Sequence, residues 1–225
     1  MIAGVAGGRP LFGPPGPLTR PTADKVKGAL FSMLETQLAA ERPGEGPELK
    51  MTEIGTEEIW EGLVVLDLYA GTGALGIEAL SRGAARCDFV EAHPAARRVI
   101  ERNLRATGLA DRARVIGMNA AKVARGAAGD VPRARYDLVL LDPPYNDQSV
   151  VTVIDDLANG TMLASGALVA VEHSRRVSLS TNYNRLVAVR ERRYGDTVLS
   201  IYRQLAATRS GEARDGHDGD LSGNV

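Results

Sequence analysis

Residues 64–76 read VVLDLYAGTGALG, and this stretch decides the expected fold. The apolar run from Val64 to Leu68 has the length of a buried strand, and the glycines after it allow a tight turn into a helix. Asp67 lies near the end of this strand, four residues before Gly71. A strand, a glycine-rich turn and a helix in this order are typical of α/β proteins that bind ligands at the carboxyl ends of parallel strands.

The flanking sequence continues the alternation of strands and helices. Its composition predicts strands at 87–90, 113–116, 136–141 and 168–171, and helices at 74–81, 95–107, 120–126 and 148–158. This alternation indicates a parallel sheet that is covered on both faces. Two final strands at 185–190 and 197–203 flank Gly195 and Asp196, which predicts a closing antiparallel hairpin. With the strand at 64–68, the prediction is a seven-stranded α/β domain.

The ends of the chain and one internal segment lie outside this pattern. Residues 1–21 are rich in glycine and proline and predict an extended arm with a short strand, followed by a helix from the N-cap Thr22 to about Leu38. Residues 41–61 hold seven glutamates against Arg42 and Lys50, so we expect a solvated acidic insertion that points away from any bound nucleic acid. The tail at 206–225 is poor in large apolar residues and is predicted to be disordered. The domain itself is therefore expected at 22–205.

The composition narrows the class of protein. A chain of 225 residues that is 44% hydrophobic can form one domain with a sizeable core. A formal net charge of −1 argues against a protein that coats nucleic acid and leaves room only for a local basic face. The single cysteine, Cys87, excludes a disulfide framework, and no Cys/His spacing suits zinc. We expect a monomeric, cytoplasmic protein without a metal or a membrane span.

The glycine turn predicts a cofactor site with two possible occupants. Gly71, Gly73 and Gly76 satisfy the dinucleotide pattern G-x-G-x-x-G, and Glu91 follows at the end of the next strand, where an acid can bind ribose hydroxyls. Asp67 favours S-adenosylmethionine over NAD, because a carboxylate repels a pyrophosphate and tolerates a positively charged amino-acid group. Asn119 could bind the adenine edge or cap the next helix. The expected cofactor residues are Asp67, Tyr69, Ala70, Gly71, Thr72, Gly73, Glu91, Ala92, Asn119 and Ala120.

A tetrapeptide after the strand at 136–141 predicts the catalytic site. It consists of Asp142, Pro143, Pro144 and Tyr145, at the edge where open α/β sheets bind ligands. The amino group of a base is a poor nucleophile because its lone pair is delocalised. Asp142 and the Pro143 carbonyl can accept hydrogen bonds from such an amine and hold it in line with a methyl donor. Tyr145 can stack on a base that has left its helix.

Together these motifs resemble the amino-methyltransferases of the seven-stranded, Rossmann-like class I fold, whose methyl donor is S-adenosylmethionine. The closer resemblance is to the RsmD family of 16S rRNA guanine-N2 methyltransferases. It rests on IAG at 2–4, GGR at 7–9, RPT at 20–22, DKV at 24–26, LF at 30–31, LDLYAGTGALGIEALSRGA at 66–84 and YGDT at 194–197.

The resemblance implies methylation of the N2 amine of one guanine in 16S rRNA, within an assembling small ribosomal subunit. It also implies RNA contacts by Arg9, Arg20, Thr22 and Lys25, donor contacts by Asp67, Gly71, Gly73 and Glu91, and a guanine held by Asp142, Pro143 and Tyr145. Two alternatives remain open: an amino-methyltransferase for DNA adenine or another amine or amide, and an NAD-dependent oxidoreductase.

Overall fold

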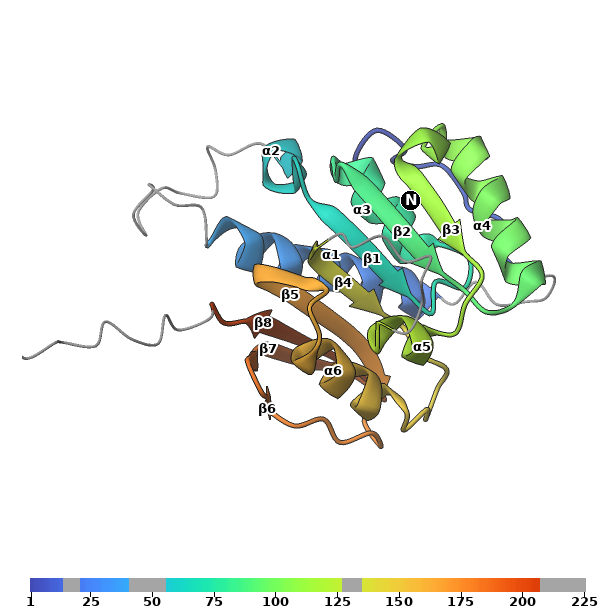
Figure 1. The fold of residues 1–225 in the computed structure, drawn as a ribbon. Helices are drawn as coiled ribbons and strands as arrows, with labels where there is room; N and C mark the ends of the chain where they lie inside the picture. The colour runs from blue at the N-terminus through green and yellow to red at the C-terminus, as the bar shows by residue number, and fades with distance from the viewer. Residues whose placement is uncertain (14–20, 41–55, 127–134, 207–225) are drawn as a thin grey trace, which may run out of the picture.

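A single eight-stranded sheet organises the chain (Figure 1). The computed structural model describes residues 1–13, 21–40, 56–126 and 135–206. Five neighbouring strands run parallel, in the order β3 (Ala113–Ile116), β2 (Arg86–Val90), β1 (Val64–Leu68), β4 (Tyr136–Leu141) and β5 (Leu163–Ser174). The sheet continues antiparallel through β8 (Thr197–Gln204), β7 (Leu186–Tyr194) and β6 (Asn182–Tyr183).

All seven predicted strands are present, and β6 is an additional eighth strand. It has only two residues, Asn182 and Tyr183, which is too short for any hydrophobic periodicity to reveal. The closing hairpin of β7 and β8 is also confirmed, and β8 pairs with β5 in the antiparallel sense. A dinucleotide-binding sheet with strand order 3-2-1-4-5-6 continues in the parallel sense at this place. The order found here therefore separates the fold from that class.

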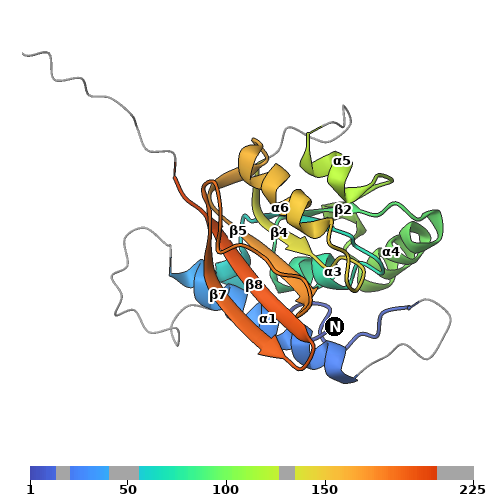
Figure 2. The ribbon, with the colours of Figure 1, turned by 90° about the horizontal axis from the view of Figure 1, so that it is seen from below.

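Helices cover both faces of the sheet, as the sequence predicted (Figure 2). On one face lie α1 (Pro21–Ala39), the short α2 (Thr56–Trp60), α3 (Ala74–Arg82) and α4 (Pro94–Thr107), and on the other lie α5 (Ala120–Ala124) and α6 (Val150–Asn159). A short 3-10 turn, Ala110–Arg112, leads into β3. Strand residues alternate between the two cores: Val65 packs with α3, whereas Leu66 and Leu68 pack with α5 and α6.

Two predictions in the N-terminal half need correction. Helix α1 begins at Pro21, so Thr22 lies inside its first turn and not before it. Proline suits this position because the first N–H groups of a helix have no partner within it. The predicted acidic insertion is not a loop throughout, because α2 ends in Trp60, which is fully buried with its ring centroid 5.5 Å from that of Phe31. Residues 41–55 of the insertion and 207–225 of the tail lie outside the described residues.

The N-terminal arm is a docked segment without a strand in its described residues, 1–13. The N–H groups of Ile2 and Ala3 donate to the buried carboxylate of Glu78 on α3, at 2.9 and 3.0 Å. Gly4 lies so close to α3 that a Cβ there would be 1.8 Å from the carbonyl oxygen of Ser81. These contacts with α3 replace the sheet pairing that the sequence suggested.

Candidate active site

The predicted site residues follow the carboxyl ends of neighbouring parallel strands. The register pairs Leu68 at the end of β1 with Val90 at the end of β2 on one side and with Leu141 of β4 on the other. Leu141 in turn pairs with Val171 of β5. The glycine loop after β1 therefore lies between the loop that begins at Glu91 and the tetrapeptide after β4. This juxtaposition is what a donor site next to a base-binding site requires.

Asp67 lies beneath the glycine loop and anchors it. Its side chain is 1% exposed, and Oδ2 accepts a hydrogen bond of 2.9 Å from the N–H of Gly76. Burial raises the pKa of Asp67 to about 7, against the opposing effect of the Gly76 hydrogen bond. Gly76 permits this closeness, because a Cβ there would lie 2.4 Å from Cε1 of Phe89 on β2. Asp67 thus fixes the start of α3, and its contact with a donor stays a prediction.

Glu91 closes the loop from the side of β2. One carboxylate oxygen accepts from the N–H of Gly71 at 2.9 Å, and the other accepts from the N–H of His93 at 2.8 Å. Each carboxylate oxygen has two lone pairs, so Glu91 retains acceptor capacity for hydroxyl groups. The carbonyl oxygen of Thr72 accepts from Nδ2 of the buried Asn103 at 2.9 Å. The loop is therefore held from both sides, while Gly71 stays partly exposed and Gly73 is buried.

Two loops of the candidate site carry backbone strain. Tyr69 has a φ of 62° and Asn146 a φ of 69°, and both are L-residues in the left-handed region. Asparagine tolerates this region, whereas for a tyrosine it costs about 1–3 kcal/mol. Tyr69 directly precedes the buried Ala70 in the glycine loop, and Asn146 directly follows Tyr145. Such strain persists only where the surrounding structure fixes it, which is common at ligand sites.

After β3, Asn119 caps α5. Its Oδ1 accepts from the N–H of Ala121 at 2.9 Å, which confirms the capping alternative. The NH2 group of this exposed side chain remains a donor, so a second role at the adenine edge stays a prediction. Ala120 is buried and Ala92 is exposed.

The tetrapeptide lines a small pocket of about 90 Å³. Asp142, Pro143 and Tyr145 form one side of it, and the other side comes from Glu172, His173, Ser174 and Thr197. Tyr145 is 61% exposed, which leaves its ring available for a ligand. Pro144 is exposed and lies outside the pocket lining, and its carbonyl oxygen accepts from the N–H of Asp147 in the turn.

Glu172 is a second acid in this pocket that the sequence analysis did not identify. It follows Val171, the β5 partner of Leu141, just as Asp142 follows Leu141, so the two acids are cross-strand neighbours. Asp142 is exposed to solvent on one side, and desolvation by the protein around the rest of its carboxyl group raises its pKa to about 6. Burial and then the charge of Asp142 raise the pKa of Glu172 to about 7. The sequence did contain a signal for Glu172, because it is an acid directly after the apolar stretch 168–171 and therefore lies at the same edge of the sheet as Asp142.

His173 has a structural role beside the acids. Its Nε2 lies 3.0 Å from the hydroxyl of Ser200, and its Nδ1 lies 3.1 Å from the carbonyl oxygen of Ser174. Burial lowers its pKa, which keeps the ring neutral near pH 7. Each ring nitrogen of His173 has one neutral hydrogen-bond partner, so the neutral ring can be buried in the wall of an acidic pocket.

The predicted RNA-binding residues lie on two separate elements. Arg9 is exposed on the arm, where its guanidinium donates to the carbonyl oxygen of Ala106 at the end of α4, at 3.2 Å. Lys25 is exposed on α1. Arg20 and the side chain of Thr22 lie outside the described residues. These contacts with RNA stay predictions.

The described part of the chain holds neither a candidate metal cluster nor a helix that could span a membrane. No group of three or more His, Cys, Asp or Glu residues there could hold a metal ion. Among the same residues, no helix is both long and apolar enough to cross a membrane.

Comparison with known proteins assigns the family. The model of the family described as "Conserved hypothetical protein 95" matches residues 1–203. The chain is 33% identical to the Bacillus subtilis (strain 168) protein named "Putative rRNA methyltransferase YlbH", over 91% of this chain and 98% of that protein. It is 30% identical to "Ribosomal RNA small subunit methyltransferase D" of Escherichia coli (strain K12), over 93% and 92% of the two chains.

A solved structure agrees with these relatives. The structure described as "Putative methyltransferase yhhF from Escherichia coli" has a TM-score of 0.70 and 28% identity, and the match covers 92% of this chain and 97% of the other. The strand order, the loop after β1 and the tetrapeptide after β4 fit the Rossmann-like class I methyltransferase fold. The chain belongs to the RsmD family.

Proposed function

We propose that this protein transfers a methyl group from S-adenosylmethionine to the N2 amine of a guanine in 16S rRNA of the small ribosomal subunit. S-adenosylmethionine supplies an electrophilic methyl group on a positively charged sulfonium. The names of the relatives support methylation of ribosomal RNA. We place the reaction in the cytoplasm, on an assembling subunit, with a monomeric enzyme.

The residues at the ends of β1 and β2 fit this donor. Glu91 presents carboxylate oxygens that accept from paired ribose hydroxyls, and it already holds the N–H of Gly71. Asp67 has a raised pKa because its charge is buried, and a nearby ammonium group would favour the charged form. The NH2 group of Asn119 is a donor for a ring nitrogen of adenine. A pyrophosphate would meet two carboxylates here instead of a cation.

The observation that carries the proposal is the pair of carboxylates, Asp142 and Glu172, in one pocket. Guanine presents two adjacent donors, the N1–H and the N2 amine, and ionised carboxylates act only as acceptors. Asp142 and the Pro143 carbonyl accept from the amine and orient its lone pair toward the methyl group. Glu172 accepts from N1–H. Tyr145 stacks on the extruded base, a contact worth about 1–3 kcal/mol.

The same pair of acids argues against the alternatives. Adenine has an acceptor at N1 beside its amine, so a second carboxylate would face a lone pair and repel it. A DNA adenine enzyme therefore fits this pocket less well than a guanine enzyme. An NAD-dependent oxidoreductase fits neither the antiparallel pairing of β8 with β5 nor the acids below and beside the glycine loop.

The test is a methylation assay with labelled S-adenosylmethionine and separate pools of small ribosomal subunits, protein-free 16S rRNA, DNA and protein. We expect label in 16S rRNA, and mapping the product should give an N2-methylated guanine. The Asp142→Ala variant serves as the control for chemistry at this pocket. Label on DNA adenine, or on protein alone, would refute the proposal.

A further inference from the structure

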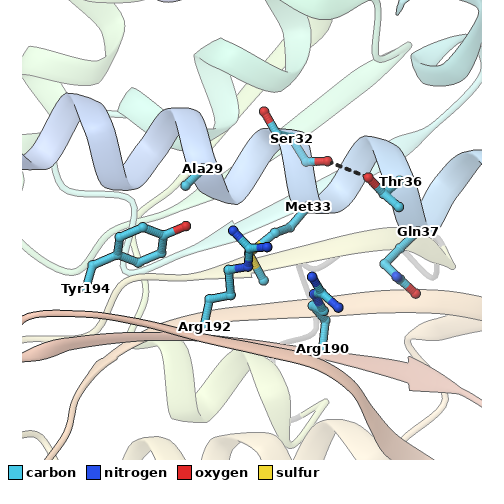
Figure 3. Close-up of a pocket in the computed structure, with 8 residues that line it drawn as sticks. All are labelled: Ala29, Ser32, Met33, Thr36, Gln37, Arg190, Arg192 and Tyr194. Carbon is cyan, nitrogen blue, oxygen red and sulfur yellow. Dashed lines mark hydrogen bonds between the residues drawn. The ribbon is translucent and has the colours of Figure 1, made fainter. Parts of the chain in front are cut away.

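A groove between α1 and β7 has the composition of an anion site. It has a volume of about 280 Å³ and is lined by Ala29, Ser32, Met33, Thr36, Gln37, Arg190, Arg192 and Tyr194. Figure 3 shows the two guanidinium groups rising from β7 toward α1, with the hydroxyl groups of Ser32 and Thr36 and the amide of Gln37 on the helix above. A water molecule takes up about 30 Å³ of liquid volume, so the groove has room for a phosphate with part of its sugar.

The two arginines reach this groove because of a β-bulge. The pairing of β7 with β8 shifts between Ala188 and Arg190, and Val189 is the extra residue. Ala188 pairs with Tyr202 and packs toward the face of α6, whereas Arg190 pairs with Ile201, which packs on the face of α1. Bulges re-aim side chains in this way next to functional sites. Without it, residue 190 would face the opposite side of the sheet.

The charge of the groove is not neutralised by nearby acids. None of the described residues that line it is acidic, and neither Arg190 nor Arg192 forms an ion pair with a carboxylate of the described chain. Glu35 of α1, the nearest acid along the helix, is bound to Arg82 on another side. Arg203 donates to both oxygens of Gln37, which leaves the NH2 of that amide as a further donor. The groove thus presents the donors and positive charge of its arginines and the NH2 of Gln37 beside its apolar floor, while the hydroxyl of Thr36 already donates to the carbonyl oxygen of Ser32.

The groove adjoins the pocket that holds Asp142. Glu172 pairs directly with Leu199 of β8, and Leu199 pairs directly with Arg192 of β7, so all three side chains lie on one face. Two strand spacings separate Glu172 from Arg192, or about 10 Å. Tyr194 of the groove pairs with Thr197 of the pocket in the same way. A nucleic-acid strand whose base enters the pocket therefore has its backbone within reach of the groove.

We propose that Arg190 and Arg192 bind a phosphodiester group of the RNA strand that carries the methylated base. The inference rests on the proposed function and adds a backbone site to its base pocket. Arginine suits this role because its planar guanidinium donates two parallel hydrogen bonds to phosphate oxygens. Such a contact positions the strand without reading its sequence. It compensates for the acidic pocket, which by itself repels phosphates.

The test compares the full-length protein with Arg190→Gln/Arg192→Gln, and with Arg98→Gln/Arg105→Gln as a matched loss of two exposed arginines on α4. Affinity for protein-free 16S rRNA and for small subunits is measured between about 50 and 200 mM salt. We expect the groove variant to lose about tenfold in affinity or more. Its plot of log K against log salt should flatten by about 0.7, since one neutralised phosphate of a single strand contributes about that much.

Kinetics give a second readout that a structural defect would not produce. The groove variant should raise KM for RNA and leave kcat at saturating RNA unchanged, with normal affinity for S-adenosylhomocysteine. Arg190→Lys/Arg192→Lys keeps the charge, so it should retain the salt slope but lose part of the affinity.

Three results would overturn the inference: a wild-type slope in the groove variant, an equal loss in the α4 control, or a loss with small subunits and not with protein-free rRNA. The last would identify a protein partner. Failure of the wild-type protein to methylate rRNA would refute the proposed function separately, because the binding slopes do not depend on turnover.

Discussion

Changing Glu172 to glutamine tests whether this acid recognises guanine. The substitution keeps the size of the side chain and removes its charge. A hydrogen bond to a charged group contributes about 1.5–3 kcal/mol, which corresponds to roughly 10- to 150-fold in kcat/KM. Affinity for S-adenosylhomocysteine should stay the same, because Glu172 lies in the base pocket and not in the glycine loop. Glu101→Gln, on the exposed surface of α4, is the matched control.

The assay can match the side chain to a single atom of the substrate. RNA with 2-aminopurine at the target position keeps the N2 amine but lacks the N1–H, together with the O6 of guanine on the side away from the amine. The wild-type enzyme should disfavour this RNA by about the factor that Glu172→Gln loses on guanine, and the variant should hardly distinguish the two substrates. The two effects are coupled only if Glu172 and N1–H interact. Additive effects of the substitution and the base change would refute this assignment.

The dependence of kcat/KM on pH is an independent test of the two acids. Asp142 and Glu172 bind the donors of guanine most strongly as ionised carboxylates, because protonation removes the charge and turns one oxygen into a donor. Their pKa values are raised to about 6 and about 7. The kcat/KM of the wild-type enzyme should therefore fall as the pH drops through 7 and fall further through 6. The two apparent pKa values of this profile describe the coupled pair of acids, and neither value belongs to one acid alone. Glu172→Gln removes the neighbouring charge, so its acid limb should move to lower pH. An unchanged acid limb would contradict the coupling of the two acids.

Three further predictions concern the amine clamp, the donor loop and the arm. Asp142→Ala should lower kcat by about 100- to 1000-fold and leave the affinity for S-adenosylhomocysteine within a few fold, as single-turnover and binding assays would show. The affinity for S-adenosylhomocysteine should rise between pH 6 and 8, because its ammonium group binds best when Asp67, whose pKa is about 7, is ionised. Calorimetry should find no such rise in Asp67→Asn. Gly4→Ala should release the arm to limited proteolysis, because its Cβ would meet Ser81, whereas Gly13→Ala has open space and should not.

The sequence predicted the parallel part of the sheet well because local signals coincide there. Around the loop from Leu68 to Gly76, hydrophobic run length, glycine spacing and the position of Asp67 all agree with one structure. The tetrapeptide after β4 was found for the same reason, since two prolines end a strand visibly. Most element ends moved by one or two residues. The exceptions are β7, which ends at Tyr194 instead of residue 190, and β5, which extends from Leu163 to Ser174, well beyond its predicted core.

Features that depend on contacts between distant segments were missed. Glu172 becomes a site residue only because β5 lies beside β4 in a register that sets it next to Asp142. The arm was expected to be extended, and its actual course depends on Glu78, more than 70 residues away. Trp60 belonged to an acidic stretch, so local charge concealed that it fills the core against Phe31. Periodicity carries no information on such pairings.

The net charge of −1 also conceals an arrangement that the structure makes visible. An acidic pocket suits the donors on the edge of a base, but it repels the phosphates that accompany the base. The distance from Glu172 to Arg192 is roughly 10 Å, and the Debye screening length is about 8–10 Å. Salt therefore screens this repulsion only in part. The two arginines of the groove make the electrostatic potential positive where the RNA backbone would lie, while the potential in the base pocket stays negative. Neutralising the groove should therefore harm binding most at low salt, where the repulsion by the acid pair is least screened. For the proposed RNA contact, the division of charge within one face of the sheet therefore matters more than the total charge.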